Sequence, residues 1–82
     1  MKRHTLSVLL EDQPGALTRV TGLLARRMFN IHSMVVEPTQ VPGETLVTLV
    51  VLVEDSRALD QVTKQLGKLI NVLEISDITE RA

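Results

Sequence analysis

The residues with the clearest chemical potential lie at 12–17, where Asp12 stands two positions before a Pro14-Gly15 pair that opens an apolar helical pattern. The start of a helix leaves several backbone N–H groups unpaired and carries a partial positive charge, so it suits a carboxylate. The acidic side chain of Asp12 could hold an ammonium group beside it. Together these groups predict a receptor for the two ends of a free amino acid. The alternative is that Asp12 is only a helix N-cap and Pro14-Gly15 only a turn.

No set of residues in the sequence has the composition of a catalytic or metal centre. His4 and His32 are the only imidazoles, and without clustered ligands both are better interpreted as ordinary strand residues. Ser33 beside His32 resembles a nucleophile with its base, but neighbouring residues of a strand point to opposite faces. The chain has no cysteine, which excludes a disulfide scaffold, a cysteine zinc site and a redox motif. We therefore expect no catalytic and no metal-binding residues.

Length and composition limit the possible classes of protein. The 82 residues suit one small domain over residues 1–82, of a size that gains stability from self-association. Phe29 is the single aromatic residue, so the core must be built from Leu, Val and Ile. A net charge of −1 gives no attraction to nucleic acid. The longest apolar stretch, Leu46 to Val53, is too short to span a membrane, and we expect no signal peptide because no apolar region follows the basic start. The absence of cysteine agrees with a cytoplasmic protein, which is our expectation.

Apolar periodicity divides the chain into six elements. Strands are predicted at residues 4–10, 30–37, 45–53 and 71–78, and helices at 15–27 and from Asp55 or Ser56 to about 69. In the first strand Leu6, Val8 and Leu10 share one face, which predicts one well-buried side. The order βαββαβ, with right-handed crossovers, predicts an α+β ferredoxin-like sandwich with a four-stranded antiparallel sheet and two helices on one face.

The loop after the first strand discriminates among the many activities that this fold carries. The strands offer no exposed aromatic residues on which bases could stack, which argues against RNA binding. Soft-metal carriers of this shape have cysteines in the loop, and phosphate-binding members have basic residues or glycines there. Glu11 and Asp12 occupy the loop instead and would repel phosphate. Two predictions stay open at this point: an amino-acid receptor, and a turn that binds no ligand.

Three segments carry a resemblance to a known family: residues 5–20 (TLSVLLEDQPGALTRV), 22–31 (GLLARRMFNI) and 63–72 (TKQLGKLINV). The chain resembles an ACT domain, and more narrowly the regulatory small subunit of acetolactate synthase, also called acetohydroxyacid synthase. The Pro-Gly-Ala-Leu turn with the later Phe-Asn-Ile is typical of amino-acid-sensing ACT domains. The segment 63–72 indicates the acetolactate synthase branch.

The resemblance implies a non-catalytic subunit that activates the catalytic large subunit and confers feedback inhibition in branched-chain amino-acid biosynthesis, with valine as the expected effector. This chain would bind no cofactor itself. Thiamine diphosphate, magnesium and FAD are expected on the catalytic partner. Two alternatives stay open: a constitutive assembly subunit that binds no effector, and a stand-alone ACT protein that serves another enzyme or regulator.

Asn30 joins the predicted site only through a homodimer. The first helix spans about 12 residues, so Gly15 and Asn30 lie at opposite ends of the sheet, roughly 18 Å apart. In an ACT-type dimer the edge strands that contain Asn30 and Ile31 pair antiparallel, which implies that the 12–17 turn of one chain lies beside Asn30 of the other. Without the resemblance, Asn30 is a simple turn residue that closes the helix.

The resemblance and the loop chemistry together give the roles of the site residues. Gly15 and Ala16 are expected to offer backbone N–H groups to the effector carboxylate. Asp12 and the other chain's Asn30 are expected to hold the ammonium, with a side-chain pocket lined by Leu17 and Ile31. The predicted effector-binding residues are Asp12, Gln13, Pro14, Gly15, Ala16, Leu17, Asn30 and Ile31. The predicted dimer edge is apolar, with Ile31, Ser33 and Val35.

Three features depart from the family pattern. Met28 stands where many members have Gly, and because Met resists a left-handed helix cap, we expect the end of the first helix to differ. His32 and Glu37 also replace residues associated with the family. Longer small subunits carry a second domain after the ACT domain, so this chain is expected to be either a short subunit or a piece of a longer one.

Overall fold

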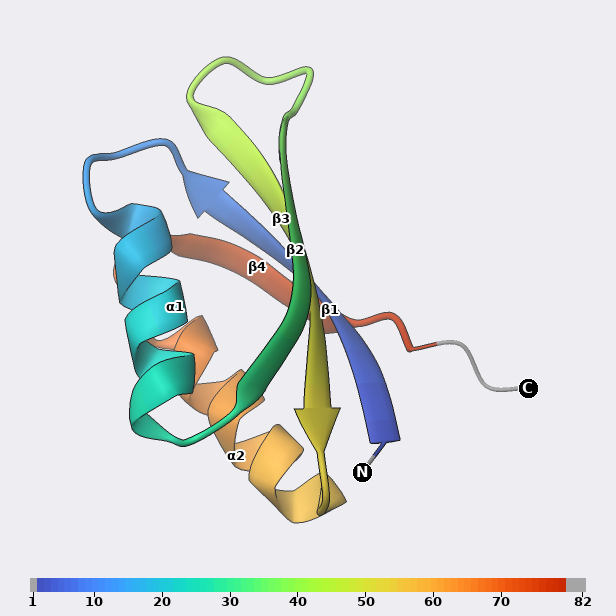
Figure 1. The fold of residues 1–82 in the computed structure, drawn as a ribbon. Helices are drawn as coiled ribbons and strands as arrows, with labels where there is room; N and C mark the ends of the chain where they lie inside the picture. The colour runs from blue at the N-terminus through green and yellow to red at the C-terminus, as the bar shows by residue number, and fades with distance from the viewer. Residues whose placement is uncertain (1, 80–82) are drawn as a thin grey trace.

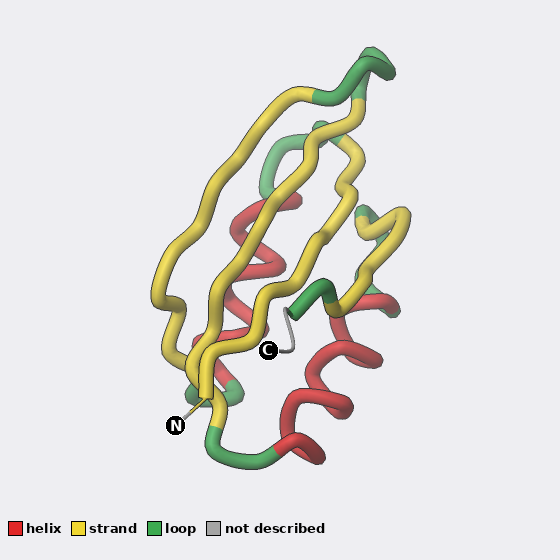
Figure 2. The backbone as a smooth tube through the Cα atoms, turned by 90° about the vertical axis from the view of Figure 1, so that its right-hand side faces the viewer, coloured by secondary structure: helices red, strands yellow, loops and turns green. Residues whose placement is uncertain are grey.

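The computed structural model describes residues 2–79, which form a sheet with two helices on one face (Figures 1 and 2). The elements, in chain order, are β1 (Lys2–Glu11), α1 (Ala16–Arg26), β2 (Asn30–Pro38), β3 (Glu44–Val53), α2 (Ser56–Gly67) and β4 (Val72–Asp77). The strands pair antiparallel in the order β2-β3-β1-β4. This arrangement confirms the predicted ferredoxin-like α+β fold. None of the helices in 2–79 is long and apolar enough to cross a membrane.

The core lies between the helices and one face of the sheet. Alternation along β1 buries Leu6, Val8 and Leu10, as predicted, and places Ser7 and Leu9 on the opposite, half-buried face. The fully buried side chains are all aliphatic: Leu6, Leu10, Leu24, Leu49, Leu66, Val8, Val20, Val47, Val51 and Val62. Each contributes roughly 1.5–3 kcal/mol through its removal from water. The sheet is therefore covered on one side only.

β2 is an edge strand, and every residue in it is exposed. Its pairing with β3 shifts by one residue at His32, because Ile31 lies opposite Val51 while Ser33 lies opposite Val50. A shift of one residue exchanges the two faces of a strand. Ile31 therefore points to the helix side with Val51, whereas Val35 points to the open side of the sheet. Ile31, Ser33 and Val35 thus lie on the predicted exposed edge, but Ile31 is on the other face from Ser33 and Val35.

The C-terminus of α1 keeps a left-handed cap although the capping residue is Met28. Its φ is 62°, and the Met28 and Phe29 N–H groups donate to the carbonyls of Ala25 and Leu24, both at 3.0 Å. This pair of bonds is the Schellman arrangement that usually contains glycine. Our expectation that the helix end differs is therefore wrong. The two hydrogen bonds offset the strain of Met28.

Replacement of Met28 by glycine is expected to stabilise the protein by about 1 kcal/mol, because a left-handed conformation costs a residue with a Cβ about 1–2 kcal/mol. The Met28 side chain is 89% exposed, so little packing is lost. Thermal unfolding should show a melting temperature about 4–8 °C higher. Arg27→Gly is the matched control, since Arg27 has a φ of −91° and should lose stability instead. An unchanged melting temperature for Met28→Gly would show that the cap carries no strain.

Candidate functional site

The loop between β1 and α1 is shaped by backbone hydrogen bonds. The Asp12 N–H donates to the Gly43 carbonyl at 2.8 Å, which fixes the loop against the β2–β3 turn. The Ala16 N–H donates to the Gln13 carbonyl at 3.1 Å, and Gly15 precedes the helix with a φ of 82°. Glycine adopts this conformation without the steric cost of a Cβ. The Pro14-Gly15 turn is thus built without help from the Asp12 side chain.

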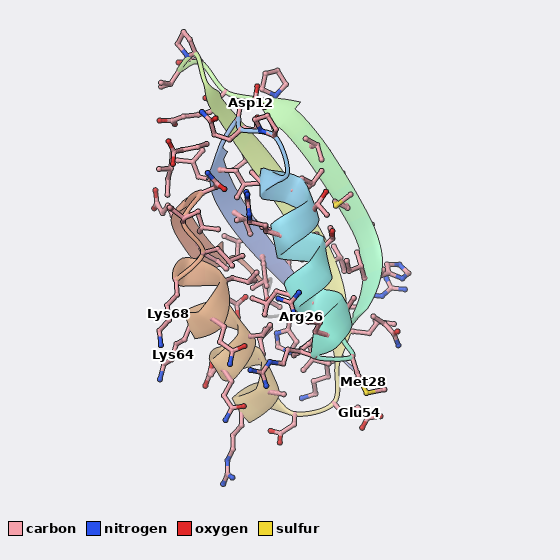
Figure 3. All side chains as sticks on the ribbon, turned by 90° about the vertical axis from the view of Figure 1, so that its left-hand side faces the viewer. Asp12, Arg26, Met28, Glu54, Lys64 and Lys68 are labelled. Carbon is pink, nitrogen blue, oxygen red and sulfur yellow. The ribbon has the colours of Figure 1, made fainter. Side chains whose placement is uncertain are left out.

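Asp12 is exposed at the tip of this loop (Figure 3). Its carboxylate has no hydrogen-bond or ion-pair partner within residues 2–79. The N-cap of α1 is Gly15, and no side chain caps the helix. This excludes the alternative that Asp12 is the N-cap. The carboxylate is available to a ligand.

Three backbone donors at the start of α1 are unpaired. The N–H groups of Gly15, Leu17 and Thr18 have no acceptor in the described part of the chain. The Ala16 N–H is already used by Gln13, which corrects the expectation that Ala16 offers a donor. Free N–H groups at the positive end of a helix dipole form a favourable position for a carboxylate. The N–H groups without an acceptor are therefore those of Gly15, Leu17 and Thr18, rather than those of Gly15 and Ala16 as expected.

Arg19 and Asn71 were missing from the predicted site. The Arg19 guanidinium Nη1 donates to Asn71 Oδ1 at 2.6 Å, and the Asn71 carbonyl accepts from the Glu11 N–H at 2.9 Å. A Cβ at Gly15 would lie 3.8 Å from three guanidinium atoms, so the positive charge lies beside the first turn of α1. The spacing of four residues between Gly15 and Arg19 puts them on one helix face and was an available signal. The contact with Asn71 had no such signal.

Asn30 and Ile31 lie at the other end of α1. Asn30 is exposed at the start of β2 and borders a hollow of about 350 Å³ whose lining includes Phe29, Leu52 and Ala58. α1 lies between this hollow and the Asp12 loop (Figure 1). The residues Asp12 to Leu17 are brought together, whereas Asn30 and Ile31 are separated from them. One chain cannot present both groups to one small ligand.

The side chains of 2–79 include no group of three His, Asp or Glu residues that could hold a metal ion. His4 Nδ1 lies 3.4 Å from Thr79 Oγ1, while His32 is exposed at the irregular position in β2. Ser33 and His32 share no hydrogen bond. The residues of the Asp12 loop can bind opposite charges, but none of them is arranged with a base and a nucleophile.

A βαββαβ sandwich whose first loop opens a helix with a Pro-Gly turn is the arrangement of an ACT domain. The fold is similar to that of the ACT domain of the GTP pyrophosphokinase of Chlorobium tepidum, with a TM-score of 0.80 at 20% identity over 93% of this chain and 96% of that one. Likeness at this identity shows the fold alone.

The chain belongs to the family of AHAS small subunit-like ACT domains, whose model matches residues 6–74. It is 54% identical over 77 residues to the acetolactate synthase small subunit of Mycolicibacterium smegmatis, covering 94% of this chain and 45% of that protein. The probable acetolactate synthase small subunit of Archaeoglobus fulgidus is 46% identical over 78 residues, covering 95% and 48%.

A solved structure of the acetolactate synthase small subunit from Thermotoga maritima matches with a TM-score of 0.84 and 32% identity, covering 94% of this chain and 47% of that one. The chain thus spans less than half the length of these relatives. The part of these relatives that the chain matches is the ACT domain, to which residues 6–74 correspond.

Proposed function

We propose that this chain is the regulatory, non-catalytic subunit of an acetolactate synthase and senses a branched-chain amino acid, with valine as the effector. The observation that carries the proposal is an exposed Asp12 carboxylate in the loop that leads into α1, where three N–H groups have no acceptor within residues 2–79, in a member of this family. These groups complement the two charged ends of an amino acid. Thiamine diphosphate, magnesium and FAD would belong to the catalytic partner.

The effector would lie across the start of α1. The N–H groups of Gly15, Leu17 and Thr18 would hold its carboxylate, with the positive charge of Arg19 nearby. Asp12 would hold its ammonium. Gln13 and Pro14 would shape the turn, and the half-buried Leu17 would contact the aliphatic side chain.

A second chain would complete the site through β2. β1 and β2 both pair antiparallel with β3, so they run in the same direction, and Pro38 lies at the same end of the sheet as the Asp12 loop. If two copies of β2 pair antiparallel over their full length, Asn30 of one copy lies opposite Pro38 of the other. This pairing would bring Asn30 and Ile31 to the other copy's Asp12 loop, and would also cover an exposed edge.

Val35→Lys is expected to weaken this homodimer at least tenfold. A full-length antiparallel pair centres on Met34, so the two copies of residue 35 would lie near the two-fold axis, where two ammonium groups repel. Val35 is 50% exposed in the single chain, so the folded monomer should survive. Val35→Thr is the matched control, because it keeps the branched shape without charge. Sedimentation at tens of micromolar measures the change; a monomeric parent chain that binds effector normally would contradict the shared site.

Calorimetry of the purified chain against valine, leucine, isoleucine and serine tests the proposed function most directly. We expect binding of valine, with weaker or no binding of serine, and valine inhibition of the complex with the catalytic subunit. The isolated chain should form no acetolactate from pyruvate with thiamine diphosphate and magnesium. Activation of the catalytic subunit without heat from any of the four amino acids would favour the constitutive assembly subunit. Binding of an amino acid without any effect on the catalytic subunit would favour a sensor for another enzyme.

A further inference from the structure

Positive charge is concentrated on the helical layer of the molecule. Residues 16–27 and 56–68 contain six of the nine Lys and Arg residues but only one of the ten Asp and Glu residues, Asp60. The six basic residues are Arg19, Arg26, Arg27, Arg57, Lys64 and Lys68, and all of them are exposed. Figure 3 shows Arg26 on α1, Lys64 on α2 and Lys68 directly after the end of α2. Although the net charge of the chain is −1, the face formed by the two helices is therefore basic.

A groove of about 490 Å³ lies between the two helices in this basic face. Leu23 and Leu69 give it an apolar part, and Arg26, Arg27 and Lys68 line it with positive charge. Among residues 2–79, no acidic side chain lines the groove. It therefore combines apolar surface with three cations.

Gln65 also lines this groove, and one of its polar atoms lacks a hydrogen-bond partner in residues 2–79. Its Oε1 atom is buried and is the only such side-chain oxygen or nitrogen in residues 2–79 without a hydrogen-bond partner. Buried polar atoms are nearly always satisfied, so an orphan acceptor in a native structure needs an explanation. This oxygen has almost no accessible surface in the isolated chain, so the Gln65 side chain, which lines the groove, would turn toward it to accept a hydrogen bond from a bound partner.

We propose that this groove is the docking surface for an acidic segment of the catalytic subunit, a proposal that rests on the function proposed above. Carboxylates of that segment pair with Arg26, Arg27 and Lys68, an N–H or O–H group donates to Gln65 Oε1, and an apolar side chain covers Leu23 and Leu69. The face is free for this role because the effector site lies at the start of α1 and the dimer uses the β2 edge. The helical face of a second copy is not a suitable occupant, because it carries the same positive charge and would be repelled.

Charge reversal tests the docking surface. Arg26→Glu with Lys68→Glu should weaken binding to the catalytic subunit at least tenfold at low salt and reduce the salt dependence of the affinity. The matched control is Lys2→Glu with Arg3→Glu, which changes the net charge equally at exposed positions of β1. Calorimetric titration of the purified catalytic subunit with each variant measures the affinities, and circular dichroism checks the fold. Equal affinity for the groove variant and the control overturns the docking surface, whereas a parent chain that binds no catalytic subunit overturns the proposed function as well.

The substitution Gln65→Met distinguishes a role of Gln65 in docking from a role in the stability of the isolated chain. Loss of the orphan acceptor should raise the melting temperature of the isolated chain, while loss of the hydrogen bond to the partner should weaken the complex about three- to tenfold. Gln61→Met, at an exposed position of the same helix, is the control and should change neither quantity strongly. A more stable Gln65→Met chain that binds the catalytic subunit as tightly as the parent would remove Gln65 from the docking surface. A less stable chain would show that the residue has a structural role.

Discussion

Gly15→Asp is expected to abolish feedback inhibition by valine. The new carboxylate would lie beside the Arg19 guanidinium, whose atoms are 3.8 Å from the position of a Cβ at Gly15. It would pair with that charge and repel the carboxylate of the effector, and it would occupy the space in front of the free N–H groups of α1. We expect affinity for valine to fall at least about a hundredfold, ~3 kcal/mol. Calorimetry and valine inhibition of the reconstituted enzyme measure the loss.

Gly15→Asn is the control that separates charge from backbone strain. Gly15 has a φ of 82°, which is unfavourable for any side chain but least so for Asn and Asp. Both variants should therefore lose about 1 kcal/mol of stability, and only the Asp variant should lose feedback completely. If Gly15→Asp stays as sensitive to valine as the parent, the effector does not lie at the start of α1. If both variants lose feedback equally, backbone strain or the bulk of the new side chain, rather than its charge, is responsible.

A mixture of Asp12→Ala and Asn30→Ala subunits is expected to recover a tight site that neither variant has alone. Each mutant homodimer has two damaged sites, because the two residues would reach one ligand from different chains. Loss of a hydrogen bond to a charged group should weaken each homodimer roughly ten- to a hundredfold. A heterodimer has one intact and one doubly damaged site. After random exchange about a quarter of all sites should be intact and should appear as a tight phase in the valine titration.

The control for this mixing experiment combines two separate preparations of Asp12→Ala, which should give no tight phase. Native mass spectrometry establishes that heterodimers have formed. If heterodimers are present and the tight phase is missing, Asp12 and Asn30 act in the same chain or in different roles. If either variant alone binds valine as tightly as the parent, that residue does not contact the effector.

The fold was predictable because its signals are local. Alternation of apolar residues along β1 and the Pro14-Gly15 turn depend on neighbouring residues only, and both were confirmed. The irregular position at His32 was not predictable, because it is set by pairing with β3 rather than by the residues of β2. Met28 was misjudged for a related reason: its intrinsic preference opposes the left-handed cap, and two hydrogen bonds override that preference.

The loop chemistry was partly predictable. The sequence identified Asp12 as the acidic group and the start of the helix as the source of donors, but it could not show which N–H groups the turn itself consumes. The Ala16 N–H donates to the Gln13 carbonyl within the turn, whereas the Thr18 N–H has no acceptor in residues 2–79. The link between Arg19 and Asn71 joins residues 52 positions apart, so only the three-dimensional fold reveals it. Sensing of valine, the homodimer and the site shared between chains stay predictions.

The length of α1 between Asp12 and Asn30 has a consequence for gene dosage. A monomer would carry two half-sites that face different directions, so effector affinity would depend on the concentration of the subunit as well as on that of the amino acid. The two equilibria are linked, so bound effector would strengthen dimerisation by the same factor by which dimerisation strengthens effector binding. A cell that makes little of this protein would then respond to its end product at a higher threshold than a cell that makes much of it.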